Sequence, residues 1–140
     1  MRWEDVKLFM HNGLHAFVSY RAHLDGVKFF PDTPAHIREA AVRAIQREIA
    51  PAVARNHPNT DEREIVRYGL GLLDRFFNPH FNDSIERGVR GIEEKLAPGE
   101  RLTGACDFIR RAGIEPKEYA ETVRIAREIS RRPAGPQPKK

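Results

Sequence analysis

The sequence lacks the features that mark several classes of protein. It has a single cysteine, Cys106, so it cannot close a disulfide within the chain. No apolar run approaches the roughly 18 residues of a membrane-spanning helix. The first residues, MRWEDV, lack the basic and then apolar segments of a signal peptide. We therefore expect a cytoplasmic protein that does not enter a membrane.

Basic residues exceed acidic residues by only four, 24 against 20, and the excess lies at the C-terminal end. The last ten residues, RRPAGPQPKK, contain four cations and no acid, so residues 1–130 hold 20 basic and 20 acidic side chains. A nucleic-acid-binding domain usually has a basic face with many phosphate contacts. We therefore predict no nucleic-acid binding, and a disordered basic tail over residues 133–140.

The 140 residues suffice for one domain, and their apolar pattern predicts an all-α fold. Apolar residues recur at helical spacing along most of the chain, and no stretch alternates as a half-buried strand does. We expect residues 1–132 to form one helical domain. Turn and capping residues divide it into about six helices, over residues 4–24, 34–50, 61–76, 84–96, 101–111 and 116–130.

Particular residues predict where some of these helices begin and end. Thr33 is placed to cap the second helix, with Pro34 as its first residue. Pro51 should kink or end that helix because proline has no backbone N–H to donate. Asn82 or Asp83 can cap the fourth helix.

Gly13 lies inside the first predicted helix. A glycine in a helix interior costs about 0.5–1 kcal/mol relative to alanine. Close approach of a ligand or of another backbone segment would explain this glycine, and tight packing between helices would explain it equally well.

The sequence has no recognisable dinucleotide-binding or metal-binding motif. The segment Gly69-Leu70-Gly71 lacks both the third glycine and the preceding strand of a nucleotide-binding turn. His11 and His15 are four residues apart, as in zinc proteases, but Asn12 follows His11 where that chemistry needs a glutamate. Cys106 has small and apolar neighbours, which favours a core position. We predict no metal site.

The candidate site lies in the first predicted helix, at Lys7, Asn12 and His15. On an α-helix with 100° per residue, Lys7 and His15 are about 80° apart, and Asn12 and His15 are about 60° apart. All three side chains can therefore line one side and form the wall of a polar pocket. The alternative is an exposed lysine, an asparagine facing solvent and a histidine hydrogen-bonded within the fold.

Two motifs give the chain a resemblance to a known family. The spacing K-x4-N-x2-H, from Lys7 to His15, resembles the catalytic motif of the polyol-specific long-chain dehydrogenases, the mannitol dehydrogenase family. The block RFFNPHFNDSIERGVRGIEEKLAPGERL, residues 75–102, is similar to the R-F-x-N-P … D-x-x-x-R … K-L-x-x-x-x-R-L pattern of the mannitol-1-phosphate 5-dehydrogenase branch. The resemblance implies the helical C-terminal substrate domain of a polyol oxidoreductase.

The resemblance also implies a role for each matching residue. Lys7 would be the general base that takes the alcohol proton, and Asn12 would donate a hydrogen bond to the reacting oxygen. His15 would orient the substrate through a hydrogen bond. Arg87 and Lys95 would reach the far hydroxyls or the phosphate of a polyol phosphate.

The basic residues of the second motif could instead have a purely structural role. Surface ion pairs would account for Arg87 and Lys95, because three glutamates are their neighbours in the sequence: Glu86, Glu93 and Glu94. Three further residues match the motif, and we expect them to end a helix and to shape the rim of the pocket: Arg75, Asn78 and Pro79.

Other members of the family carry an N-terminal nucleotide-binding domain, whereas this chain begins a few residues before Lys7. The resemblance therefore implies NAD held by a domain absent from this chain, and no hydride transfer on this polypeptide alone. We expect a fragment or split gene, a subunit that joins a separate nucleotide-binding chain, or an orphaned domain. The alternative function is a non-catalytic helical interaction or ligand-binding module. A domain shaped to meet another should expose an apolar patch near Lys7 and His15.

Overall fold

A computed structural model of the chain describes residues 3–132, so the predicted tail at residues 133–140 lies outside the described residues. Apart from an isolated antiparallel bridge between Phe29 and Ser84, these residues form only helices, turns and loops, which confirms the all-α prediction. None of the helices in this part of the chain is long and apolar enough to cross a membrane. The elements are α1 (Trp3–Val6), η1 (Lys7–Asn12), α2 (Gly13–Leu24), η2 (Phe30–Asp32), α3 (Ala35–Ala44), η3 (Ile45–Ile49), α4 (Ala50–Asn56), α5 (Glu62–Phe76), α6 (Ile85–Val89), α7 (Ile92–Lys95), α8 (Thr103–Arg111) and α9 (Lys117–Arg131).

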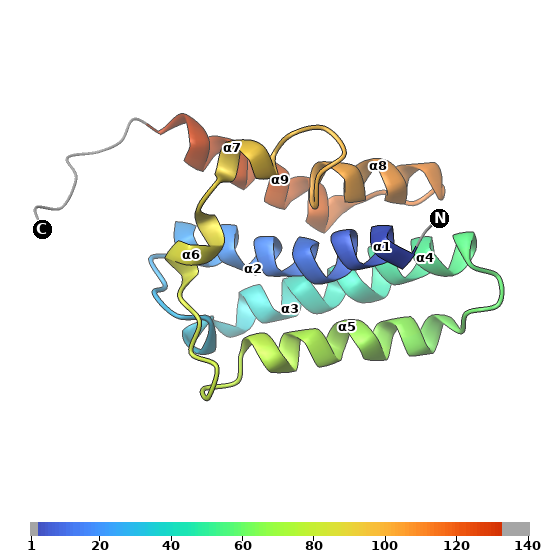
Figure 1. Ribbon diagram of the computed structural model, residues 1–140, viewed down its shortest axis with the longest axis horizontal. Coiled ribbons are helices and arrows are strands. Elements are labelled where there is room, and N and C mark those ends of the chain that lie inside the picture. Colours follow the sequence, from blue (N-terminus) through green and yellow to red (C-terminus); the bar gives the residue numbers. More distant parts are fainter. Residues whose placement is uncertain (1–2, 133–140) are drawn as a thin grey trace, which may run out of the picture.

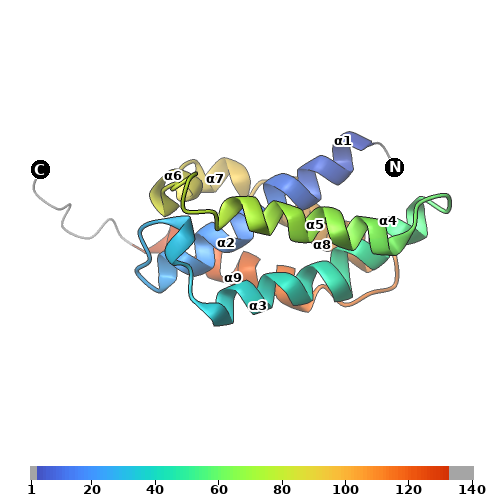
Figure 2. The same cartoon turned by 90° about the horizontal axis from the view of Figure 1, so that it is seen from below.

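The helices form a bundle around α2. In Figure 1, α8 and α9 lie above α1 and α2, and α3 and α5 lie below them. Figure 2 shows that α6 lies at the same end of the bundle as the C-terminal end of α5. Because α6 packs against α2, the loop between α5 and α6 is held close to the residues of α2.

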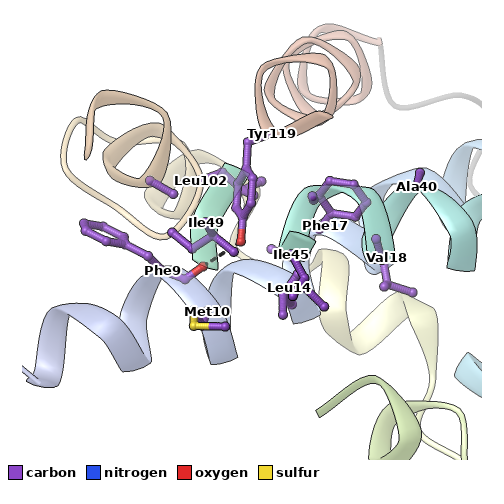
Figure 3. Close-up of a cluster of buried hydrophobic side chains, with 14 of the residues drawn as sticks. Phe9, Met10, Leu14, Phe17, Val18, Ala40, Ile45, Ile49, Leu102 and Tyr119 are labelled. Carbon is purple, nitrogen blue, oxygen red and sulfur yellow. Dashed lines mark hydrogen bonds between the residues drawn. The ribbon is translucent and has the colours of Figure 1, made fainter. Parts of the chain in front are cut away.

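The first predicted helix is confirmed as one continuous segment of α1, η1 and α2, with a π-helical turn over η1. The Gly13 N–H donates to the Leu8 carbonyl oxygen, five residues back, as expected of a π turn. Figure 3 shows side chains of this segment in the core with residues of η3 and with Leu102 and Tyr119. The buried Tyr119 hydroxyl donates to the Phe9 carbonyl oxygen at 2.9 Å, which ties α9 to the π turn.

Close approach of another backbone explains Gly13. A Cβ atom on Gly13 would lie 2.9 Å from the carbonyl oxygen of Arg101, closer than real Cβ contacts allow. The same atom would lie 3.5 Å from the Tyr119 ring. The segment before α8 can therefore pack against this helix only because residue 13 has no side chain.

The second predicted helix continues past its expected end. It comprises α3, η3 and α4 and reaches Asn56. Of the two predicted effects of Pro51, a kink or an end near residue 50, the end is therefore wrong. A proline ring normally clashes with the carbonyl four residues back, which here belongs to Arg47 in η3. A π turn is wider than an α turn, so this geometry is compatible with a helix that continues through Pro51. The predicted cap is also wrong: Pro34 is the N-cap residue, and the Thr33 hydroxyl instead donates to the Phe30 carbonyl oxygen at 2.7 Å.

The third predicted helix is confirmed as α5, where the Asp61 side chain accepts the Arg63 N–H at the first turn. The fourth is divided into α6 and α7, because Gly91 adopts a left-handed conformation with φ of +69°. Ser84 caps α6 by accepting the Arg87 N–H, so the prediction of Asn82 or Asp83 as the cap is wrong. The last two predicted helices are confirmed as α8 and α9.

A buried carboxylate from η3 caps α9. Pro116 offers no side-chain cap, and the Glu48 oxygens accept the N–H groups of Glu118 and Tyr119 at 2.7 and 3.1 Å. The Glu118 carboxylate in turn pairs with Arg21 at 3.2 Å. These contacts fix α9 against α2 and η3, so the core beside η1 is held by polar as well as apolar contacts.

Candidate functional site

The two histidines of the first helix lie among aromatic side chains. The His15 ring stacks on Phe30 with centroids 4.5 Å apart and meets the edge of Phe76 at 5.2 Å. The His11 ring stacks on Phe76, with centroids 5.9 Å apart. The structure therefore brings η2 and the C-terminal end of α5 against one side of η1 and α2.

These rings border a cavity of about 270 Å³. It is lined by residues from four elements and the loop before α6: His11, His15, Phe30, Arg75, Phe76, Phe81 and Asp83. Phe81 is 65% exposed, whereas Phe30 is fully buried. The cavity thus has aromatic walls, two imidazoles and one side chain of each charge, which suits a small polar ligand.

A short backbone pairing holds Asp83 beside His15. The Phe30 N–H donates to the Asp83 carbonyl oxygen at 2.9 Å, and the Ile85 N–H donates to the Lys28 carbonyl oxygen at 2.9 Å. The Asp83 carboxylate lies 3.7 Å from His15 Nε2. The same pairing therefore places both a ring against one face of His15 and a carboxylate near its Nε2 atom.

Arg87 joins this group through Asp83. Its guanidinium lies 3.2 Å from the second oxygen of the Asp83 carboxylate, one helical turn away, and is largely exposed. The ion pair expected with Glu86 is not formed by Arg87, because Glu86 pairs with Arg90 at 3.2 Å. Arg87 therefore does not line the cavity itself and is connected to His15 through Asp83.

The Lys95 side chain extends from α7 to the C-terminal end of α6, which packs against His15. Its ammonium group donates to the Gly88 carbonyl oxygen at 2.9 Å. Gly88 packs directly on α2, where a Cβ atom on it would lie 3.3 Å from the His15 ring. Burial lowers the pKa of Lys95, and repulsion from Arg101 lowers it further.

Electrostatics favours a neutral His15. Burial lowers the pKa of the His15 imidazole, and the positive charge of Lys95 adds to that effect, while Asp83 opposes it. The pKa of His11 is lowered by burial and by the charges of Arg75 and Lys7. Neutral imidazoles can both donate and accept a hydrogen bond, which a protonated ring cannot do.

Lys7 and Asn12 occupy the first and last positions of the π turn. Lys7 is exposed, and its charge acts on His11, whereas Asn12 is half-buried. Neither residue lines the cavity that contains His15. Of the five predicted site residues, His15 alone lines this cavity. Arg87 and Lys95 contact groups next to His15, and Lys7 and Asn12 lie on the adjoining turn of the same helix.

Five residues that line this cavity have no site role in the sequence prediction: His11, Phe30, Phe76, Phe81 and Asp83. The sequence suggests Asp83 only as a helix cap. It does not support His11 as a metal ligand, and it gives the three phenylalanines no role at the site. The D-x-x-x-R part of the second motif is a signal for Asp83, because it pairs that carboxylate with Arg87. No sequence signal places Phe30 against His15.

The residues at positions 3–132 contain no cluster of three or more histidine, cysteine, aspartate or glutamate side chains that could hold a metal ion. Cys106 is buried, as expected for a core position. Burial raises the pKa of its thiol to about 11, so the thiolate is scarce near neutral pH. Cys106 does not line the cavity at His15.

Comparisons with known proteins identify the family of the chain. The family model described as the mannitol dehydrogenase C-terminal domain matches residues 1–126. The chain is 30% identical over 112 residues to mannitol-1-phosphate 5-dehydrogenase of Caldanaerobacter subterraneus, covering 79% of this chain and 28% of that protein. It is 31% identical over 119 residues to the enzyme of that name from Shouchella clausii, covering 84% of this chain and 31% of that protein. The chain thus spans about three tenths of the length of these curated relatives, and it belongs to the mannitol dehydrogenase C-terminal domain family.

Proposed function

We propose that the chain is the substrate-binding and catalytic half of an NAD-dependent polyol oxidoreductase that acts on a polyol phosphate, as the name mannitol-1-phosphate 5-dehydrogenase suggests for its relatives. The observation that carries the proposal is the set of contacts that links two cations to His15, which lines a cavity beside the K-x4-N-x2-H turn: Arg87 through Asp83, and Lys95 through Gly88. An imidazole suits the hydroxyls of such a substrate, and two cations suit its phosphate.

The proton of the reacting alcohol is assigned to Lys7. Oxidation of an alcohol carbon releases a proton from oxygen and a hydride from carbon, so a base must lie near the oxygen. Lys7 is exposed in this chain, and a domain packed over it would remove water from the amine and favour its neutral form. The assignment therefore depends on contact with a second domain.

Asn12 and His15 are assigned to the reacting oxygen and the neighbouring hydroxyls. The Asn12 amide donates a hydrogen bond that strengthens as negative charge develops on the oxygen. Residues 3–132 contain no strand followed by a glycine-rich turn and helix, so they do not fit a dinucleotide. We assign acceptance of the hydride to NAD held by a separate nucleotide-binding domain or chain.

The catalytic assignment is tested by supplying a nucleotide-binding domain. The chain is joined to the nucleotide-binding domain of a curated relative, and NADH formation from mannitol 1-phosphate is followed by absorbance. We expect activity that Lys7→Ala lowers by about 10²- to 10⁴-fold, as for the loss of a general base. Lys117→Ala is the matched control, because that lysine is exposed and does not line the cavity. Full activity in Lys7→Ala would remove Lys7 from its role.

The binding assignment is tested on the chain alone. Mannitol 1-phosphate should shift the NMR signals of His11 and His15, and mannitol should do so more weakly because it offers no phosphate to Arg87 and Lys95. Arg87→Ala should weaken binding, whereas Arg67→Ala, an exposed arginine on α5, should not. Binding in the absence of any turnover by the joined protein would favour the ligand-binding module over the enzyme.

A further inference from the structure

A second cavity lies away from the one at His15. It has a volume of about 470 Å³ and is lined by residues of α8, of α9 and of the loop that follows α7. The helices α8 and α9 pack against each other. Its apolar lining includes Leu96 and Val123. Its lining also contains four arginines, Arg110 from α8 and three from α9: Arg124, Arg127 and Arg131. No residue of the His15 cavity lines this groove, so the two are separate.

The groove has more positive than negative charge. Among the described residues, Asp107 is the one acidic side chain that lines it, 3.8 Å from Arg110. Arg124 is engaged outside the groove by Glu121 at 2.7 Å. Arg127 and Arg131 form no ion pair with any residue in the described part of the chain. Two guanidinium groups on one wall are therefore available to an anion.

The spacing of the arginines directs them to one side of α9. Positions 124, 127 and 131 are separated by three and four residues, so their side chains follow one face of the helix. Arg110 stands on the neighbouring helix, across the groove. A planar guanidinium can hold two oxygens of a phosphate or carboxylate at once. The apolar lining between the two walls gives a ligand a surface to bury.

The positive charge of the groove is confined to this part of the surface. Basic and acidic residues balance over residues 1–130, so the arginines of the groove are not part of a generally basic surface. Arg131 belongs to the C-terminal excess of basic residues, yet it stands on the last turn of α9 and lines the groove. A groove of this volume is in the size range of small-molecule cavities, whereas nucleic acid needs an extended basic stripe.

We propose that the groove between α8 and α9 binds a small organic phosphate, with its phosphate on Arg127 and Arg131 and its apolar or planar portion on the lining at Leu96 and Val123. The site is independent of the proposed polyol site, since the two cavities share no residue. Arg110 faces the same anion from α8.

Calorimetry and NMR titration of the full chain test this site, with adenosine diphosphate as the probe and pyrophosphate and adenosine as its two halves. We expect saturable binding of adenosine diphosphate that weakens with salt, weaker binding of pyrophosphate, and no binding of adenosine. Arg127→Ala and Arg131→Ala should each weaken binding by about tenfold, because each removes a charge-assisted hydrogen bond. The matched control is again Arg67→Ala on α5.

Four results would overturn the proposal. Absence of saturable binding at millimolar adenosine diphosphate would exclude the site. An equal loss in Arg67→Ala would show general charge attraction rather than a groove. Pyrophosphate binding as tightly as adenosine diphosphate would mean that the apolar lining is unused. Signal changes at His15 instead of at residues of α8 and α9 would place the phosphate in the polyol site.

Discussion

The contact between α2 and α6 can be tested by adding a single carbon atom. A Cβ atom on Gly88 would lie 2.8 Å from the Cβ of Ser19 and would overlap the Ser19 hydroxyl. Ser19 Cβ is attached to the backbone of α2, so it can move only if the helix moves. On α5, Gly71 is exposed, and a Cβ atom there would meet nothing within 4 Å. Gly88→Ala and Gly71→Ala are therefore the same chemical change in opposite surroundings.

The two variants should change stability in opposite directions. Alanine in an open helix stabilises by about 0.5–1 kcal/mol relative to glycine, which is the whole expected effect at Gly71. Adding a carbon to a packed contact costs about 1–3 kcal/mol. For Gly88→Ala, the two effects combine to a net loss of about 1–2 kcal/mol in the free energy of unfolding.

Urea denaturation of the full chain, followed by circular dichroism, measures this difference. Gly88→Ala should lower the midpoint, and Gly71→Ala should raise it, with the slope unchanged in both. In a Ser19→Gly background, Gly88→Ala should cost much less, because both overlapping atoms of Ser19 are gone. A Gly88→Ala variant as stable as Gly71→Ala would refute the packing of α6 on α2, and with it the positions of Arg87 and Lys95.

Three more predictions concern the polar contacts. Asp83→Asn should lower the pKa of His15 further, because Asp83 is the group that raises it, and an NMR titration of the His15 ring measures the change. Burial raises the pKa of the Glu48 carboxyl in the folded chain above its value in the unfolded chain. The stability that comes from protonated Glu48 is therefore fully present below the unfolded pKa and is lost as pH rises through the folded pKa. In urea denaturation, the free energy of unfolding of the natural chain should therefore fall relative to that of Glu48→Gln as pH rises from about 4.5. A difference between the two proteins that does not change with pH would contradict this prediction. Tyr119→Phe should cost about 1–2 kcal/mol in the same assay, because the hydrogen bond to the Phe9 carbonyl is lost.

Much of the fold follows from apolar spacing, and the errors lie where local geometry departs from a regular α-helix. Periodicity predicted the first helix and α5 almost to their ends, because a buried stripe is the main signal for a helix. It missed the π turn that lets a helix continue through Pro51, since that turn changes the backbone but not the apolar pattern. It also missed the break at Gly91, whose left-handed conformation is one of several that glycine adopts.

The candidate site was predictable only along the helix that carries its motif. The spacing of Asn12 and His15 follows from one helix, so sequence reasoning could place them together. The contacts of His15 with Phe30 and Asp83 arise from a backbone pairing between two loops far apart in the sequence. Such pairing leaves no periodic signal, so it could be found only from the structure.

The π turn reduces the angle between the two proposed reacting groups around the helix axis. In an α-helix, Lys7 and Asn12 would be about 140° apart. Hydrogen bonds between residues five apart widen the turn and bring position 12 closer to alignment with position 7. Two contacts with other parts of the chain stabilise the π turn. The backbone of Arg101 packs against Gly13 at the end of the turn, and the Tyr119 hydroxyl donates to the Phe9 carbonyl oxygen within the turn. The geometry of the proposed catalytic residues near one end of the chain is therefore maintained by α9 near the other.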